Sequence, residues 1–284
     1  MLMFIGLPII SSFFQSLHIE PEQILMEVEK CDPFGCKTET KVDIEATNKL
    51  QEEQPLGRFN GLGTYGDRNH LAFDEIKEAW TNSSSIAEFT DILLNLPFYK
   101  ALLFTLTFCF AVTPPVVVLG FIVALSVNTI TKSLKGPTIF GVILPMIVTP
   151  LIGSLVLFWM IDAKGILGSF IQFLFDDPNL SLKSSSQLTW ITLIIYGIWH
   201  NTPFAFVVFY AALQTVPQDP IEAAIIDGAS RYERVRHIVI PHLYPVATFI
   251  ILICLMDNFR VLEPIIGFAA EGVAQSLSWM IYND

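Results

Sequence analysis

The chain has 284 residues and a formal net charge of −11, with 52% hydrophobic residues, only 15% charged residues and a mean hydropathy of +0.55. This composition is too apolar for an ordinary soluble domain and is typical of a membrane protein. Because the balance of charge is acidic, we expect no nucleic acid among its partners.

The first apolar run covers residues 1–17. A signal peptide is one interpretation, but the run contains no Lys or Arg and no clear small-x-small cleavage site. We therefore predict that residues 1–17 form a first transmembrane helix, truncated at its cytoplasmic start.

The segment 18–97 carries sixteen Asp and Glu residues against seven Lys and Arg. Since cytoplasmic loops of membrane proteins are enriched in Lys and Arg, we predict that this segment is an extracytoplasmic loop forming a small cap. Alternating polar and β-branched residues predict a strand pair around Lys37–Glu45. Ser85 and Glu88 have the spacing of a capping box, which predicts an amphipathic helix over Ile86–Leu96 along the outer membrane surface.

The four cysteines divide by location. Cys31 and Cys36 enclose Asp-Pro-Phe-Gly in the predicted outer loop, where a turn and an oxidising compartment favour a disulfide between them. Free thiols are the alternative. A metal site would need more ligands than this pair, and no second cluster supplies them, so no metal is predicted. Cys109 and Cys254 lie in apolar runs and are expected to be inert packing residues.

Four apolar stretches follow, at 101–128, 138–161, 190–213 and 243–256, the last extendable through Phe259. The first three reach the roughly 20 residues that a helix needs to cross a bilayer. The connection 129–137 carries two Lys and no acid, and the segment 214–242 carries three Arg, so both are predicted to be cytoplasmic. The segments 162–189 and 260–284 are then outside, and 98–284 forms the transmembrane core.

Between the third and fourth stretches lies a charged, helix-forming segment. Asp219 at an N-cap, Pro220 at the first helical position and Glu222 at the third predict a helix that begins at Pro220. Its apolar stripe, Ile221, Ala224, Ile225 and Gly228, is expected to provide a docking face, with Gly228 ending or kinking the helix.

A second helix is predicted to open with the capping box of Ser230 and Glu233 and to run toward Pro241.

This segment resembles the EAA motif of the membrane subunits of bacterial ABC importers. Glu222-Ala223-Ala224 is followed after three residues by Gly228 and after nine more by Ile238-x-Ile240-Pro241, with Ile240 where the family usually has Leu. The segments Phe59–Tyr65 and Ala211–Gln214 resemble the corresponding segments of the carbohydrate-uptake, maltose-type branch of these permeases. An amphipathic surface loop with well-formed caps is the alternative interpretation.

The resemblance implies an all-α polytopic permease bundle, with five helices present of an expected six and an acidic extracytoplasmic insertion. It further implies that the motif docks as a coupling helix on a separate ATPase subunit. The partners would be an ABC ATPase pair that binds ATP and Mg, a second, non-identical permease, an extracytoplasmic solute-binding protein and the lipid bilayer of the bacterial inner membrane. The ATPase-coupling residues would be Asp219, Glu222, Ala223, Ala224, Asp227, Gly228, Arg231 and Pro241.

Polar side chains within the apolar stretches mark a candidate solute pathway. Tyr196, Trp199, His200 and Asn201 lie near the middle of the third stretch, where unpaired polar groups are costly. Asp257 and Asn258 lie at the C-terminal end of the fourth apolar stretch. The alternative is that these groups bond to neighbouring helices and hold the bundle together. Asp257 and Arg260 are three residues apart and could pair as an outer gate, or simply mark the membrane surface.

The sequence contains no G-x-x-x-x-G-K-[ST], H-E-x-x-H or G-x-S-x-G motif, so we expect neither an enzyme nor a cofactor in this chain. A secondary transporter or channel would need intramembrane acidic residues, which the three long stretches lack. A membrane-anchored sensor would explain the acidic loop but not the EAA segment. The absence of Asp, Glu, Lys and Arg from the three long apolar stretches favours a neutral, polyhydroxylated solute such as a sugar.

Overall fold

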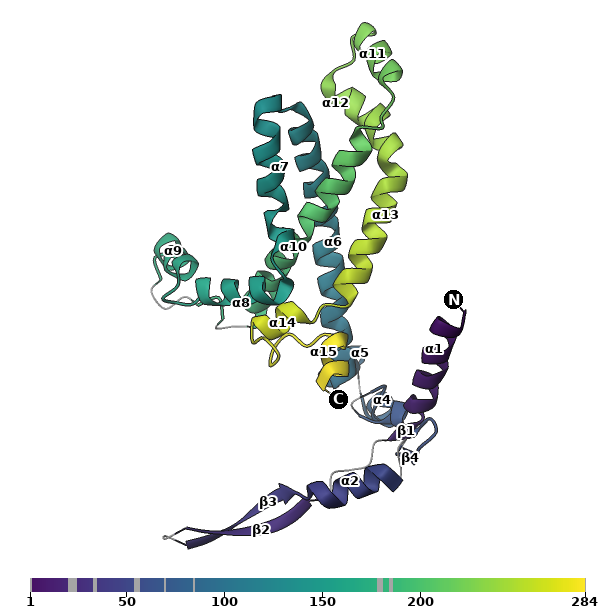
Figure 1. The fold of residues 1–284 in the computed structure, drawn as a ribbon, viewed down its shortest axis with the longest axis vertical. Helices are drawn as coiled ribbons and strands as arrows, with labels where there is room; N and C mark the ends of the chain where they lie inside the picture. The colour runs from purple at the N-terminus through teal and green to yellow at the C-terminus, as the bar shows by residue number, and fades with distance from the viewer. Residues whose placement is uncertain are drawn as a thin grey trace. The chain divides into compact units, whose positions relative to one another are not determined.

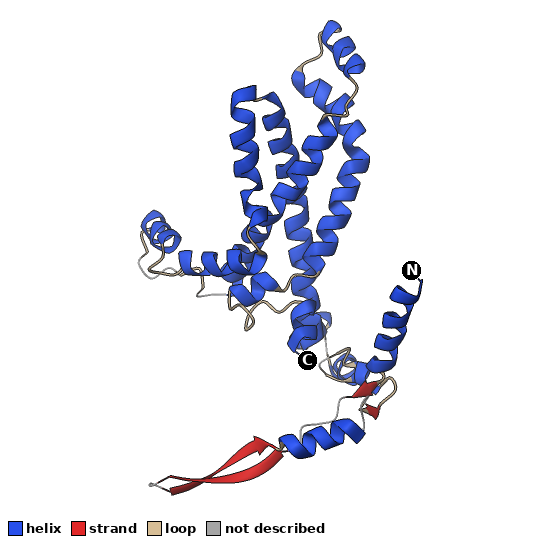
Figure 2. Ribbon diagram, in the orientation of Figure 1, coloured by secondary structure: helices blue, strands red, loops and turns tan. Residues whose placement is uncertain are grey.

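The computed structural model describes residues 2–19, 25–32, 35–53, 57–68, 70–83, 85–177, 181–183 and 186–283. These divide into two compact units, Met1–Tyr99 and Lys100–Asp284, which are taken in turn. Figure 2 shows that the described strands all belong to the first unit, whereas the second is helical.

The first unit begins with an apolar helix. Its described elements are α1 (Leu2–Ser16), β1 (His18–Ile19), β2 (Leu25–Asp32), β3 (Gly35–Val42), α2 (Ile44–Glu53), β4 (Arg58–Phe59), α3 (Gly63–Gly66), α4 (Phe73–Asn82) and α5 (Ile86–Asn95). The predicted helix over 1–17 is confirmed as a helix, but its 15 residues are about 22 Å long at 1.5 Å per residue. That is shorter than the roughly 30 Å hydrocarbon core of a bilayer, so its crossing of the membrane stays a prediction.

The segment Phe59–Tyr65 lies against the end of α1. The backbone N–H of Asn60 donates to the Leu17 carbonyl at 2.9 Å, and the Tyr65 hydroxyl donates to Ser16 Oγ at 2.7 Å. β4 pairs antiparallel with β1 beside these bonds. The segment is therefore anchored to the C-terminal end of the first helix.

The predicted strand pair exists, but its boundaries differ. β2 pairs antiparallel with β3, so the hairpin begins at Leu25 and ends at Val42. Glu45 lies instead in α2, because the Asp43 side chain accepts the Ala46 N–H at 3.0 Å and starts a helix there. In α5 the Ser85 hydroxyl accepts the Ala87 N–H at 3.1 Å, which confirms Ser85 as an N-cap.

The hairpin register places Cys31 directly opposite Cys36. Opposed residues of antiparallel strands have Cα atoms about 4.5–5.5 Å apart, within the range that a disulfide spans. The side chains of both residues lie outside the described part of the structure, so the disulfide stays a prediction. We expect both thiols to resist alkylation in protein isolated from membranes and to react after reduction; alkylation without reduction would contradict the pairing.

The second unit is a helical bundle, shown in Figure 1 with its long helices side by side. Its described elements are α6 (Pro97–Thr129), α7 (Lys132–Ile147), α8 (Pro150–Met160), α9 (Ile166–Phe175), α10 (Ser186–Leu213), α11 (Gln218–Ile226), α12 (Arg231–Arg234), the π-helical turn η1 (Val235–Val239), α13 (Ile240–Phe259), α14 (Glu263–Gly267) and α15 (Leu277–Asn283). Among the described residues, three helices are long and apolar enough to cross a membrane: α6, α10 and the continuous helix Arg231–Phe259. With the bent pair α7 and α8 counted as one span, the number is four.

The core of this unit lies where α6, α10 and α13 meet. Val112, Phe206 and Ile250 are fully buried there, one from each helix. Gly120 of α6 permits the closest approach, since a Cβ at this position would lie 2.5 Å from the Ala205 Cβ of α10. Small residues at such crossings let membrane helices pack through their backbones.

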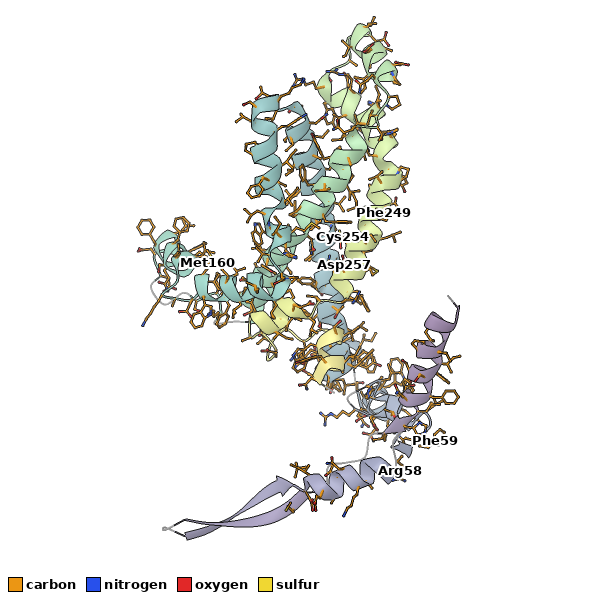
Figure 3. The ribbon with its side chains drawn as sticks, in the orientation of Figure 1. Arg58, Phe59, Met160, Phe249, Cys254 and Asp257 are labelled. Carbon is orange, nitrogen blue, oxygen red and sulfur yellow. The ribbon has the colours of Figure 1, made fainter. Side chains whose placement is uncertain are left out.

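The outer surface of the bundle is apolar. Phe249 and Leu252 of α13 are 51% and 61% exposed, whereas Cys254 is buried; Figure 3 labels Phe249 and Cys254 on this helix. Cys109 and Cys254 are both free and buried, as their positions in apolar runs predict. An apolar exterior of this extent is expected of helices that face lipid.

The run 138–161 was predicted from its length to cross the bilayer, and the structure forms it as two helices bent by 94°. Val148 and Thr149 are extended between them, and Pro150 occupies the first turn of α8. Pro150 disfavours the α-helical conformation in the residue before it, which favours the turn of the chain here. Figure 1 shows α8 running across the end of the bundle, where α14 packs on it.

The helix predicted to open at Ser230 and run toward Pro241 is present, and it continues into the fourth apolar run. The helix runs without a break from Arg231 to Phe259. Pro241 has no N–H for the usual backbone bond, and the preceding turn widens so that Ile240 N–H reaches the Val235 carbonyl. The π turn therefore accommodates the proline within a continuous helix.

Candidate functional site

The helical hairpin formed by α11 and the start of α12 projects from one end of the bundle (Figure 1). α11 begins at Gln218, two residues before the predicted start, so Asp219 and Glu222 do not form the expected capping box. Pro217 has extended backbone and takes the N-cap position instead. Pro220 then lies in the first turn, where its missing N–H is not needed. Asp219 remains in that turn, where a negative charge complements the helix dipole.

The turn between the two helices is built on Gly228, as predicted. Gly228 has φ of +81°, a left-handed conformation that favours glycine. Its N–H donates to the Ile225 carbonyl at 3.1 Å, and the Ala229 N–H donates to the Ala224 carbonyl at 2.9 Å. These two bonds are a Schellman motif, which ends α11 and fixes the direction in which the chain leaves it.

The capping box of the second helix is confirmed in full. Ser230 N–H donates to the Glu233 carboxylate at 2.7 Å, and Glu233 N–H donates to Ser230 Oγ at 3.3 Å. The bonds from Ser230 hold the pKa of Glu233 below its usual range. Because this pKa is lowered, the stability that ionised Glu233 contributes is fully present above the usual carboxyl pKa. It is lost as the pH falls through the pKa of the folded state.

The surface that the hairpin exposes differs from the predicted docking stripe. Ile221 and Ala224 are half-buried against the rest of the unit, whereas Ile225 is 52% exposed and Ile226 is 86% exposed. The other exposed residues of the helix include Glu222, Ala223 and Asp227. The tip of α11 therefore presents two isoleucines beside acidic side chains, and nothing in the described part of the chain covers them.

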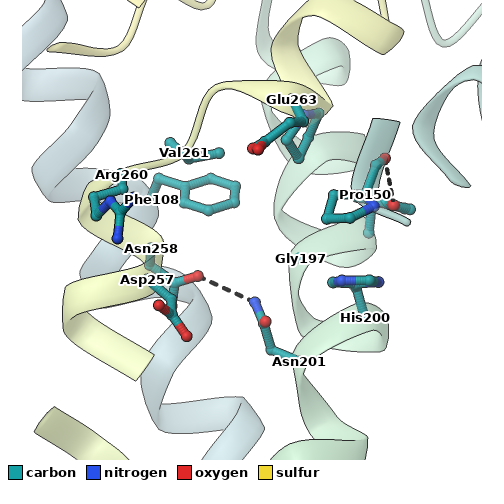
Figure 4. A pocket seen from close by; sticks show the side chains of 12 residues that line it. Phe108, Pro150, Gly197, His200, Asn201, Asp257, Asn258, Arg260, Val261 and Glu263 are labelled. Carbon is teal, nitrogen blue, oxygen red and sulfur yellow. Dashed lines mark hydrogen bonds between the residues drawn. The ribbon is translucent and has the colours of Figure 1, made fainter. Parts of the chain in front are cut away.

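A polar cavity of about 300 Å³ lies between the helices, away from the hairpin (Figure 4). It is lined by Phe108 of α6, Pro150 of α8, Tyr196, Gly197, His200 and Asn201 of α10, Asp257 and Asn258 of α13, and Arg260, Val261, Glu263 and Pro264 after it. Five of the six predicted pathway residues thus come together at one place.

Trp199, the sixth, lies elsewhere. It is 49% exposed and lines a different hollow with Val142 and Leu119. Successive residues of a helix point about 100° apart, so the neighbour of His200 need not share its face. Seven lining residues were absent from the predicted pathway set. Arg260 was considered only as a gate or surface marker, and apolar residues such as Phe108 and Gly197 carry no polar signal that could have identified them.

Three of the predicted pathway residues join helices. The Tyr196 hydroxyl of α10 donates to the Pro150 carbonyl of α8 at 2.9 Å. Asn201 Nδ2 donates to Asn258 Oδ1 at 3.1 Å, and Asn258 Nδ2 donates to Thr113 Oγ1 at 3.1 Å. This chain of bonds connects α10, α13 and α6, and Asn258 is only 3% exposed. These amides therefore hold the bundle together, as the alternative interpretation stated.

The remaining polar groups of the cavity are less engaged. Within the described residues, His200 Nδ1 is buried without a hydrogen-bond partner. Asp257 and Arg260 are exposed and form no ion pair with one another in that part of the chain. The predicted pairing of these two residues as an outer gate is therefore not observed. Figure 4 shows Asp257, Arg260 and Glu263 around the cavity.

Replacing Thr113 with valine tests the amide network. Valine has nearly the same shape but cannot accept the Asn258 N–H, so a buried donor loses its partner at a cost of about 1 kcal/mol. We expect a lower thermal midpoint for the detergent-solubilised protein. Thr138, whose hydroxyl bonds only to its own helix at Leu134, provides the matched control, and Thr138→Val should leave the midpoint nearly unchanged. Equal midpoints for the two variants would contradict the role of the network.

The apolar helices, the internal polar cavity and the exposed hairpin define a polytopic membrane protein of the transport class. Residues 86–262 match the family model described as binding-protein-dependent transport system inner membrane component, and the chain belongs to this family. The described residues hold no group of three or more His, Cys, Asp or Glu that could bind a metal ion.

Curated relatives agree with this assignment. The chain is 34% identical over 115 residues to the trehalose/maltose transport system permease protein MalF of Thermococcus litoralis, covering 37% of this chain and 39% of that protein. It is 26% identical over 210 residues to the sn-glycerol-3-phosphate transport system permease protein UgpA of Yersinia enterocolitica, covering 71% and 68%. The matches thus span from about two fifths to about two thirds of these relatives.

Solved structures share the fold. A chain of a bacterial alginate ABC transporter, in complex with an alginate pentasaccharide-bound periplasmic protein, aligns with a TM-score of 0.55 at 18% identity, covering 74% of this chain and 72% of that one. A chain of a bacterial ABC transporter involved in the import of alginate aligns with a TM-score of 0.52, also at 18% identity, covering 84% and 81%. At this identity the likeness shows the fold alone.

Proposed function

We propose that this chain is the permease subunit of an ATP-driven ABC importer and forms part of the pathway for a sugar or a related neutral, polyhydroxylated solute. The observation that carries the proposal is the hairpin. Its first helix ends in a Schellman motif at Gly228 and exposes Glu222, Ala223 and an 86% exposed Ile226. An exposed apolar tip with fixed geometry is what docking on a separate ATPase requires.

In this proposal the partners are a pair of ATPase subunits that bind ATP and Mg, a second, non-identical permease and an external solute-binding protein. The hairpin lies on the cytoplasmic side of a bacterial inner membrane, and the loop 18–97 lies outside. Closure of the ATPases shifts the hairpin, and the bundle switches between two states because the ATPases contact the hairpin differently in each.

The polar cavity supports the solute class. Its lining includes two carboxylates, Asp257 and Glu263, and one guanidinium, Arg260. This balance disfavours an anionic solute and suits hydroxyl groups, which can both donate to the acids and accept from the arginine. The names of the relatives include trehalose and maltose, which are neutral, and glycerol phosphate, which is not.

Glu222→Gln tests the docking of the hairpin, since it removes an exposed charge without changing size. We expect ATPase co-purification and solute uptake both to fall about tenfold, as for loss of a charged contact at an interface. Glu271→Gln is the matched control, because Glu271 follows α14 at the opposite end of the bundle from the hairpin. Unchanged co-purification and uptake in Glu222→Gln would count against the proposal.

A further inference from the structure

A second cavity lies at the base of the hairpin. Its volume is about 340 Å³, and it is enclosed by the C-terminal ends of α6 and α10 and by the residues of α11, α12 and η1 that face them. Its polar side chains are Asn128, Thr129, Gln218, Arg231 and Arg234. It shares no lining residue with the polar cavity described above.

The charge of this cavity is entirely positive. Arg231 and Arg234 line it, and no Asp or Glu is among the described residues of its wall. Arg234 Nε is buried, and in the described part of the chain nothing accepts its hydrogen bond. Burying a guanidinium N–H without an acceptor costs free energy. An anionic oxygen bound in the cavity would accept this hydrogen bond and remove the cost.

Asn128 can also donate to a ligand in the cavity. Asn128 Oδ1 already accepts from Gln214 Nε2 at 3.3 Å, which leaves the Asn128 amide N–H groups for another acceptor. Two guanidinium forks and an amide match the several oxygens of a phosphate group better than a single carboxylate.

The rest of the wall is aliphatic. Leu125, Leu213, Val216 and Val239 lie beside the arginines. A free, fully hydrated anion would make no favourable contact with these aliphatic side chains. A phospholipid carries both a phosphate and acyl chains, and the acyl chains can pack against them. Lys132 follows the lining residue Thr129 by three positions, so further positive charge lies at the same end of the bundle.

We propose that this cavity binds the phosphate of an anionic phospholipid, held by Arg231 and Arg234 at the base of the hairpin. The lipid would join the bundle to the first turns of the hairpin. The inference does not depend on the importer proposal, because it concerns only the chain and the bilayer.

Native mass spectrometry of the full chain in a nonionic detergent tests the site with added phosphatidylglycerol. We expect phosphatidylglycerol to remain bound and phosphatidylcholine to dissociate, and Arg234→Ala to weaken phosphatidylglycerol binding about tenfold. Arg234→Lys keeps the charge and should recover only part of the affinity.

Arg236→Ala is the matched control. Arg236 is two residues away and exposed, does not line the cavity, and donates to the Tyr232 hydroxyl at 3.3 Å. It should bind phosphatidylglycerol like the unsubstituted chain. Equal weakening by Arg234→Ala and Arg236→Ala would show only general attraction to negative charge and would overturn the site.

Two further outcomes also decide the source of the anion. If millimolar inorganic phosphate displaces the lipid readily, or binds where phosphatidylglycerol does not, the ligand is free phosphate and the lipid assignment fails. If no lipid binding depends on Arg234 but ATPase co-purification does, the arginine serves an acidic group of a protein partner, and the proposal is wrong while the proposed function stands.

Discussion

Gly228→Val should strongly reduce solute uptake while leaving the protein inserted in the membrane. Gly228 has φ of +81°, where a residue with a Cβ is disfavoured by about 1–2 kcal/mol and a β-branched residue by more. No atom lies within 4 Å of the Cβ position, so the effect is conformational and not a clash. The Schellman bonds from Gly228 and Ala229 should be lost, and α11 should then point in a different direction.

Uptake into reconstituted vesicles, normalised to the amount of inserted protein, measures this effect. We expect a fall of at least about tenfold, because geometry at a docking surface controls affinity steeply. Gly228→Asn is the control, since asparagine tolerates the left-handed conformation and should retain most of the uptake. If valine transported as well as asparagine, the fixed direction of the hairpin would not matter for transport.

Gly120→Ala and Gly141→Ala should change stability in opposite directions. At Gly120 the new Cβ would lie 2.5 Å from the Ala205 Cβ and 3.0 Å from two backbone atoms of α10. The helices must separate, at a cost of about 1–3 kcal/mol. At Gly141 of α7 nothing lies within 4 Å, so alanine should stabilise the helix by up to about 1 kcal/mol through its higher helix propensity.

The thermal midpoints of the two variants in one detergent provide the comparison. Gly120→Ala should melt below the unsubstituted protein and Gly141→Ala at or above it. A midpoint for Gly120→Ala equal to that of the unsubstituted chain would mean that α6 and α10 do not approach as closely as described.

Local chemistry could be predicted well where few residues decide it. Ser230 and Glu233 form their capping box, and Gly228 ends its helix, because each depends on backbone groups three or four residues away. The start of α11 was predicted two residues too late, because Asp219 was taken as the N-cap residue whereas Pro217 occupies that position. The sequence pattern alone does not show which of the two residues precedes the first turn.

The effect of a proline could not be predicted in the same way, because it depends on packing. Pro150 turns the chain by 94° because α8 can pack across the end of the bundle against α14, whereas Pro241 is absorbed in a π turn and the helix continues. Both residues look alike in the sequence. The cavity shows the same limit, since His200 and Trp199 are adjacent in the sequence but only His200 lines it.

The docking of the hairpin on an ATPase is the central claim, and cross-linking from its tip tests it most directly. In a chain with Cys31 and Cys36 replaced by serine, Ile226→Cys places a thiol at an 86% exposed position, while the native Cys109 and Cys254 are buried. In membranes that also contain the ATPase, this thiol should react only with reagents applied from the cytoplasmic side and should cross-link to the ATPase. Labelling from the outside, or the absence of any cross-link to a neighbouring subunit, would contradict the account.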